Sequence, residues 1–254
     1  MTRALRVGLA QIPVTAGRST ENVERIVSAL DEAARSECDI VVTPECAISG
    51  WLCPPETTDV QQIPGPIVDL VGQRCRQLGM AVVLGMEEMR GHDRFNSAVF
   101  LDRDGEIRNV HRKINEVDIG RHRYRRGDSV GVFEFDGVTL GITICADSWI
   151  TPIVGAMHAM GAEIILSPCA WAIIPGDESK NTAWISDAYR SHTAERDDLY
   201  IIATNAIGAL EPPHPWAGRI LHGDSLAYGP GGTQIAHGPR NRSAMLTVDV
   251  TLAA

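Results

Sequence analysis

Short apolar runs alternate with helix-like segments over the first third of the chain. Apolar residues recur at helical spacing between positions 23 and 34, and residues 66–78 form a second helical segment that stops at Gly79. Apolar runs at 6–14, 39–43 and 81–85 lie around these two segments, and we interpret them as strands. The order strand, helix, strand, helix, strand is typical of an α/β unit with parallel strands.

Pairs of short strands around glycine-containing turns follow this unit. The turns lie at 104–105, 136–137 and 229–232, each between two apolar runs. The further strands expected are 98–102, 106–112, 132–135, 139–144, 163–167, 200–204, 225–228, 234–237 and 245–250, with helices at 153–160 and 181–196. Because most runs are continuous rather than alternating, we expect strands covered on both faces. The sequence predicts one α/β domain over residues 1–254, layered from helices and sheets with mixed strand directions.

The composition, 44% hydrophobic and 22% charged, is that of a folded protein. A net charge of −9, from 23 basic and 32 acidic residues, disfavours general binding to nucleic acid or to anionic membranes. No apolar run approaches the ~20 residues of a membrane span, and the N-terminal segment lacks the apolar core of a signal peptide. We therefore expect a soluble, cytoplasmic protein with no nucleic-acid or membrane partner.

Three reactive side chains each follow a predicted strand. Glu45 comes after the run at 39–43, Lys113 after 106–112, and Cys145 at the end of 139–144. Reactive groups collect at strand ends in α/β proteins. Cys145 could attack a carbonyl or nitrile carbon, Glu45 could take the thiol proton and later activate water, and Lys113 could stabilise negative charge on oxygen. Each residue alone is more typical of a cap, a surface or a core, so the inference depends on the three together.

The order and surroundings of these residues resemble the nitrilase superfamily of carbon–nitrogen hydrolases, which has a Glu-Lys-Cys triad in the same order. The similar segments are 41–45, 111–114, 141–147, 161–168, 194–205 and 223–232, and they run through almost the whole chain. The resemblance implies an α/β fold of the nitrilase-like class, a four-layer α-β-β-α sandwich. It also implies a cysteine-dependent hydrolase of amides or nitriles.

A course of reaction follows from the same resemblance. Cys145 would form a thioester and release ammonia or an amine, and water would then free the acid. Lys113 would hold the oxyanion together with the backbone N–H of Ala146. The resemblance implies no metal and no organic cofactor, and a homodimer or higher homo-oligomer. The remaining five cysteines form no Cys-x-x-Cys pair, and we expect reduced thiols that mostly pack in the core.

One position departs from the family pattern. Many members carry a second glutamate seven or eight residues after the lysine, where this chain has Gly120 and Arg121. Glu116 is the nearest acid, at a different spacing. Two explanations stay open: Glu116 supports Lys113 through an altered loop, or the charge of the substrate does. Asp147, two residues after the cysteine, could also help to orient the site.

The arginine-rich segment 121–126 and several tryptophans are candidates for substrate binding. The guanidinium of Arg121 or Arg123 could bind a substrate carboxylate, with a solvated loop or a subunit contact as the alternative. Trp149 and Trp171 adjoin the expected site loops, as do the tryptophans at 51 and 216, and could line a pocket.

Two competing patterns fail. Residues 223–226, Gly-Asp-Ser-Leu, match the nucleophile motif of a class of serine hydrolases, but no Asp-x-x-His follows Ser225 and no Gly-x-Ser-x-Gly is present. His214, His222 and His237 lack the close spacing with thiols or carboxylates that a metal site needs, so we expect no metal.

The sequence thus favours a hydrolase of a small linear carboxamide or N-carbamoyl compound. A nitrile substrate is the alternative within the family, although members that hydrolyse nitriles tend to have Trp after the cysteine, where this chain has Ala146. A non-catalytic binding protein that keeps the fold is the alternative from another class. The sequence does not predict which compound is hydrolysed, because loops build the pocket.

Overall fold

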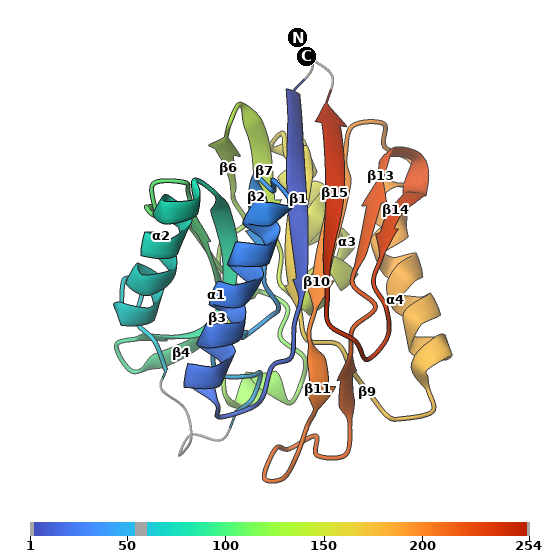
Figure 1. Cartoon of the computed structure of the whole chain (residues 1–254). Helices are drawn as coiled ribbons and strands as arrows, with labels where there is room; N and C mark the ends of the chain where they lie inside the picture. The colour runs from blue at the N-terminus through green and yellow to red at the C-terminus, as the bar shows by residue number, and fades with distance from the viewer. Residues whose placement is uncertain (1–2, 54–59, 253–254) are drawn as a thin grey trace.

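Two six-stranded sheets form the centre of the computed structural model, which describes residues 3–53 and 60–252 (Figure 1). The first sheet holds β1 (Arg3–Gln11), β2 (Ile40–Val42), β3 (Ala81–Arg90), β4 (Asp93–Leu101), β5 (Ile107–Arg112) and β15 (Ala244–Leu252). The second holds β6 (Val132–Phe135), β7 (Val138–Ile142), β8 (Ile164–Cys169), β10 (Tyr200–Asn205), β13 (Leu226–Gly229) and β14 (Thr233–His237). A small third sheet holds β9 (Ala172–Ile173), β11 (Ile207–Ala209) and β12 (Ile220–His222).

The helices are α1 (Ser19–Arg35), α2 (Pro66–Leu78), α3 (Thr151–Ala159) and α4 (Glu178–Thr193), with short 3-10 turns η2 (Gly120–His122), η3 (Cys145–Trp149) and η4 (Pro230–Gly232). Within the ranges described, no helix is long and apolar enough to cross a membrane.

Parallel strands form the middle of both large sheets. In the first sheet β1, β2 and β3 run parallel, because α1 and α2 return the chain between them. In the second sheet β7, β8 and β10 run parallel. Antiparallel strands extend both sheets, so strand directions are mixed as predicted. β15 pairs with β1 along its whole length, so that Arg3 lies opposite Leu252 (Figure 1).

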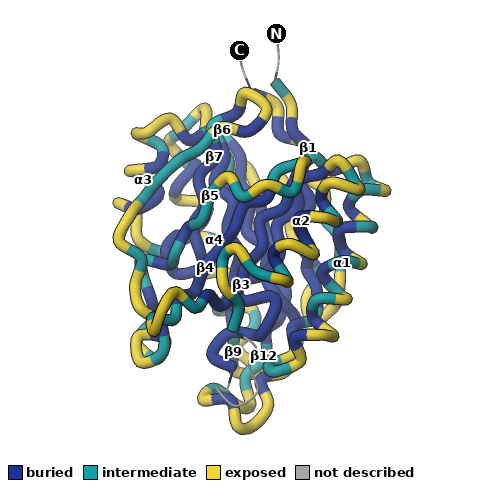
Figure 2. Tube along the Cα trace, turned by 90° about the vertical axis from the view of Figure 1, so that its left-hand side faces the viewer, coloured by how far each residue is buried: buried dark blue, intermediate teal, exposed yellow. Residues whose placement is uncertain are grey.

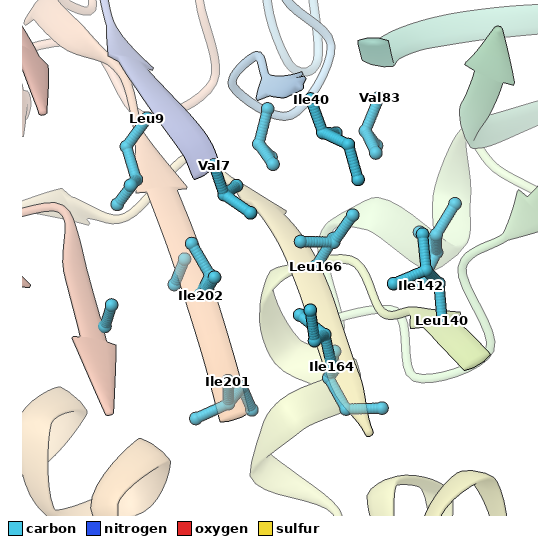
Figure 3. Packing of buried hydrophobic residues seen from close by; sticks show 14 of the residues in the cluster. Val7, Leu9, Ile40, Val83, Leu140, Ile142, Ile164, Leu166, Ile201 and Ile202 are labelled. Carbon is cyan, nitrogen blue, oxygen red and sulfur yellow. The ribbon is translucent and has the colours of Figure 1, made fainter. Parts of the chain in front are cut away.

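Helices cover the outer faces of the sheets, and the inner faces pack on one another. α1 and α2 bury Ile26, Leu30 and Val71 against strand residues such as Val41 and Val82. Side chains of the first sheet then meet those of the second in a continuous apolar layer (Figure 3), whose labelled members include Val7, Leu9, Ile40, Val83, Ile142, Leu166 and Ile202. α3 and α4 pack on the second sheet from the other side. The strands are accordingly buried while the helices expose one face (Figure 2), and the predicted four-layer α-β-β-α sandwich is confirmed.

The strands differ from the prediction in several places. β3 was expected to end at residue 85 but continues to Arg90, because Glu87 and Glu88 are buried and ion-paired with distant arginines. β4 begins at Asp93 instead of residue 98, and a tight turn at Gly91 joins it to β3. The short strands β9, β11 and β12 were not expected, since runs of two or three residues show no periodicity.

Candidate active site

The three reactive residues singled out in the sequence meet at one pocket. Glu45 follows β2, Lys113 follows β5 and Cys145 follows β7, and all three line the same cavity. Lys113 Nζ donates a hydrogen bond to Glu45 Oε1 over 2.5 Å. Both side chains of this ion pair are 1% exposed, so solvent screens their interaction weakly.

Glu45 is held by contacts that the sequence did not predict. Asn96 of β4 donates its Nδ2 to Glu45 Oε1 over 2.6 Å, and the backbone N–H of Glu45 donates to the carbonyl of Cys169. Gly85 of β3 permits a close approach of the chain, since a Cβ there would lie 2.1 Å from the carbonyl oxygen of Pro44. Asn96 was missed because its strand was expected to begin two residues later. An amide among buried strand residues is the signal that could have found it, because a buried polar group needs a partner.

Glu116 lies beside the lysine in spite of its different spacing. Its Oε2 is 3.9 Å from Lys113 Nζ, and the glutamate is 1% exposed. Gly120 makes room for this carboxylate, since a Cβ at Gly120 would lie 2.5 Å from Glu116 Oε2. The residue that replaces the family's second glutamate is therefore small where Glu116 needs the space. Of the two explanations left open by the sequence, this geometry favours the altered loop.

Burial and the two acids set the charge state of the lysine. Burial acts to lower the pKa of Lys113, but Glu45 and Glu116 outweigh it and raise that pKa well above its ordinary value. Burial raises the pKa of Glu116 to about 7, although the ammonium of Lys113 acts against it. Lys113 is therefore charged at neutral pH, while Glu116 exchanges a proton near neutrality.

Cys145 stands on a tight turn between β7 and η3. Ile144 is extended, but Cys145 has a φ of 48°, a left-handed conformation that residues other than glycine adopt rarely. Such strain persists only where the surrounding structure imposes it, often at functional sites. Burial raises the pKa of the Cys145 thiol well above its ordinary value, and Cys169 and Glu45 add to the effect. The resting side chain is thus a thiol, so attack on a carbon needs a base, and Glu45 is the carboxylate in the same pocket.

Asp147 ties the segment after β5 to the turn that carries Cys145. Its Oδ1 accepts the backbone N–H groups of Ile114 and Asn115 at 3.0 and 2.7 Å, and its Oδ2 accepts the N–H of Ile144 and lies 2.9 Å from His111 Nε2. Burial acts to raise the pKa of Asp147, but the contacts with His111 and the N–H groups lower it. The carboxylate is therefore charged and positions the two segments, and it does not line the pocket.

The cavity itself has a volume of about 200 Å³ and aromatic walls. Trp149 and Trp171, the two predicted pocket residues, both line it, as do Trp51 and Trp216. The lining residues that were not foreseen include Trp184, Ile185 and Asn181 from α4 and Arg219 from the segment before β12.

The sequence model of the carbon–nitrogen hydrolases matches residues 6–254. The chain belongs to the carbon–nitrogen hydrolase family. This match covers nearly the whole chain and confirms the resemblance to the nitrilase superfamily. Among curated relatives, the glutamine-dependent NAD(+) synthetase of Xylella fastidiosa is 32% identical over 202 residues, which are 75% of this chain and 36% of that protein. The chain therefore spans well under half the length of that synthetase.

Solved structures agree with the family on the fold. A carbon–nitrogen hydrolase from Helicobacter pylori G27 superposes with a TM-score of 0.89 at 21% identity, over 97% of this chain and 88% of that one. A mutant of the amidase from Nesterenkonia sp. AN1, with the acetamide moiety of fluoroacetamide added covalently at its active-site cysteine, superposes with a TM-score of 0.81. Its identity is 21%, over 97% of this chain and 90% of that one. These likenesses confirm the nitrilase-like fold.

The arginine-rich loop of this carbon–nitrogen hydrolase does not reach the pocket. Arg121 is half exposed, pairs with Asp118 and donates to the carbonyl of Glu116. Arg123 is largely buried and pairs with Glu87 of β3. The expectation that either arginine contacts the substrate therefore does not fit the structure, because neither lines the cavity and each has a partner elsewhere.

Ser225 of the competing serine motif has a structural role in the hydrolase. Ser225 is fully buried, and its hydroxyl accepts the backbone N–H of Asn205 over 2.9 Å. Across residues 3–53 and 60–252, no group of three or more His, Cys, Asp and Glu side chains could hold a metal ion. All six cysteines are buried and free of disulfides.

Proposed function

We propose that this carbon–nitrogen hydrolase is a thiol amidase, which cleaves a small carboxamide or N-carbamoyl compound through a thioester at Cys145. The observation that carries the proposal is the buried ion pair of Glu45 and Lys113, 2.5 Å long, in the pocket that Cys145 also lines. A base, a cation and a nucleophile are the groups that acyl transfer through a thioester requires.

The first half-reaction forms a C–S bond and breaks the C–N bond. Glu45 takes the thiol proton of Cys145 as Sγ bonds to the carbonyl carbon, and the carbonyl oxygen becomes negative beside the ammonium of Lys113. The backbone N–H of Ala146 is the second proposed donor to this oxygen. As the adduct collapses, the C–N bond breaks and the proton held by Glu45 passes to the leaving nitrogen. Ammonia or an amine departs, and the acyl group remains on sulfur.

The second half-reaction returns the thiol. Glu45 takes a proton from a water molecule as the water oxygen bonds to the thioester carbon, and Lys113 again faces the negative oxygen. The C–S bond then breaks, the proton passes to Cys145 Sγ, and the carboxylic acid leaves. In this scheme Glu116 keeps Lys113 charged, and Asp147 acts through the segments that it positions.

Two alternatives remain as outcomes of the test. Ala146 after the cysteine disfavours a nitrile substrate, and the intact set of three residues disfavours a binding protein without activity. Because curated relatives include glutamine-dependent synthetases, glutamine belongs among the amides tested.

Intact-protein mass spectrometry and ammonia release test the proposal together. The protein is mixed with amides, N-carbamoyl compounds and nitriles, and the same panel is given to the Cys145→Ala and Cys38→Ala variants. We expect an acyl adduct and ammonia from the wild type and from Cys38→Ala, whose cysteine lies outside the pocket, but from Cys145→Ala neither. Adducts that persist in Cys145→Ala, or no adduct and no ammonia from any compound, would contradict the thioester mechanism.

A further inference from the structure

Every tryptophan of the chain lines the active-site cavity. The sequence has five, and all five are in the lining: Trp51, Trp149, Trp171, Trp184 and Trp216. They come from five separate segments of the chain, so no single sequence motif places them together. Such a concentration of flat apolar surface favours a ligand with a flat apolar part, since aromatic side chains give most of their binding energy through contact area.

Two edge-to-face tryptophan pairs form part of these walls. Trp51 and Trp216 meet edge to face with ring centroids 4.8 Å apart, and Trp149 and Trp184 meet in the same way at 4.8 Å. Trp51 and Trp216 pack with a small apolar cluster near Tyr124, whereas Trp149 packs on the main core. The two pairs therefore pack in different apolar clusters, and both line the cavity.

Arg219 is the charged group of the cavity that the proposed chemistry does not use. The charged lining residues are Glu45, Lys113 and Arg219, and the first two pair with one another. The Arg219 guanidinium lies 4.2 Å from the ring centroid of Trp216. No acidic side chain in residues 3–53 or 60–252 pairs with it, in contrast to Arg123, which Glu87 holds. The described lining thus carries one positive charge without a counter-charge.

We propose that Arg219 binds a carboxylate of the substrate, and that the substrate is a carboxamide whose carboxylate and amide are joined by a short flat apolar body. A guanidinium presents two parallel N–H groups that fit a carboxylate, and a ring against its face restrains its plane. The tryptophan walls would contact the body between the two ends. This inference rests on the proposed amidase function and names the class of substrate for the same site.

The volume of the cavity limits the size of that body. About 200 Å³ accommodates one ring and its short arms, and a larger fused system would have to extend past Trp184, whose side chain is half exposed. The monoamide of benzene-1,4-diacetic acid has the required parts, and its methyl ester is a neutral partner of similar shape. The monoamide of glutaric acid keeps the carboxylate but lacks the ring.

Steady-state kinetics with these three amides test the proposal. We expect Arg219→Gln to lower kcat/KM for the aromatic acid by about 10- to 100-fold, mainly through KM, and for the methyl ester by less than about threefold, as loss of a charged hydrogen bond implies. Arg219→Lys should restore part of the loss. Arg108→Gln is the matched control, because this substitution also removes one positive charge and Arg108 lies on β5, outside the cavity. Trp184→Ala should lower kcat/KM more for the aromatic acid than for the monoamide of glutaric acid.

Binding to the Cys145→Ala variant separates this proposal from the proposed function. Because all five tryptophans line the cavity, their fluorescence reports occupation of the site without any turnover. We expect Arg219→Gln in that background to raise the Kd of the aromatic acid by about 10- to 100-fold and to leave the Kd of the ester nearly unchanged. Equal effects on acid and ester, or an unchanged preference for the acid, would overturn the role of Arg219. If Cys145→Ala binds the acid with that preference but the wild type hydrolyses none of the three amides, the proposed amidase function would be contradicted instead.

Discussion

Replacing Glu116 by glutamine removes a buried charge whose cost depends on pH. Burial raises the pKa of the Glu116 carboxyl from its ordinary 4.5 to about 7. Below pH 4.5 the carboxyl is protonated in both the folded and the unfolded chain, so it contributes no pH dependence. Between pH 4.5 and 7 the unfolded chain loses this proton while the folded protein keeps it. The stability of the wild type therefore falls as pH rises through this window and is constant above it.

The size of this effect follows from the same two values. Each tenfold change in proton affinity corresponds to about 1.4 kcal/mol, so the change from 4.5 to about 7 corresponds to roughly 3 kcal/mol. Glu116→Gln keeps the shape of the side chain without the charge. We expect the variant to be as stable as the wild type near pH 4 and more stable by about 2–3 kcal/mol at pH 8. The proposed amidase activity should fall in this variant, because Lys113 loses one of its two carboxylate neighbours.

Urea denaturation of both proteins at a series of pH values measures the effect. Glu134→Gln is the matched control, because Glu134 is an exposed residue of β6 without a charged partner in the described structure. The control should follow the wild type at every pH. The reasoning would be refuted if Glu116→Gln and the wild type showed the same stability difference at pH 5 as at pH 8, or if the variant were less stable at pH 8.

Three further substitutions give distinct outcomes. Gly120→Ala places a Cβ 2.5 Å from Glu116 Oε2 and should move this carboxylate away from Lys113. Ammonia release assays should then show kcat lowered by about 10- to 100-fold, the effect of small displacements in an active site. An unchanged kcat would contradict the packing argument. Asp147→Asn puts an amide N–H against backbone N–H donors. We therefore expect kcat to fall by at least about tenfold with a smaller change in KM. A change in KM alone would show that Asp147 does not position the site. Arg123→Gln leaves the buried carboxylate of Glu87 with Arg94 as its remaining arginine partner. Denaturation should therefore show the free energy of unfolding lowered by about 2–4 kcal/mol. A raised KM for anionic amides with unchanged stability would instead show that Arg123 binds the substrate.

The centre of the fold could be predicted because its strands are covered on both faces. Continuous apolar runs mark β1, β2 and β8, and the helical spacing of apolar residues marks α1. The second half of β3 could not be found in this way. Glu87 and Glu88 are polar, and they are ion-paired with arginines outside β3, at positions 94, 112 and 123. A local pattern carries no information about such partners.

The same distinction separates the foreseen from the unforeseen parts of the site. Glu45, Lys113 and Cys145 each follow a strand, and the ends of strands in the two sheets meet because of the topology. Asn96 and Arg219 enter the site through hydrogen bonding and ring contacts with residues that tertiary packing selects. The dense positive charge at 121–126 suggested Arg121 or Arg123 for the pocket. Charge density in the sequence does not reveal which arginine lacks an acidic partner in the folded protein.

Glu116 supplies a second carboxylate beside Lys113 at a spacing that differs from the family pattern. The physical requirement is a carboxylate within a few ångströms of the lysine ammonium, and that requirement fixes a distance in space rather than a number of residues. Glu116 meets it at 3.9 Å from Lys113 Nζ, only three residues along the chain. A side chain at Gly120 would collide with this carboxylate, so the acid at 116 and the absence of a side chain at 120 depend on one another. A departure from a family pattern at one position is therefore informative about a second position, because the space that one residue gives up is the space that the other occupies.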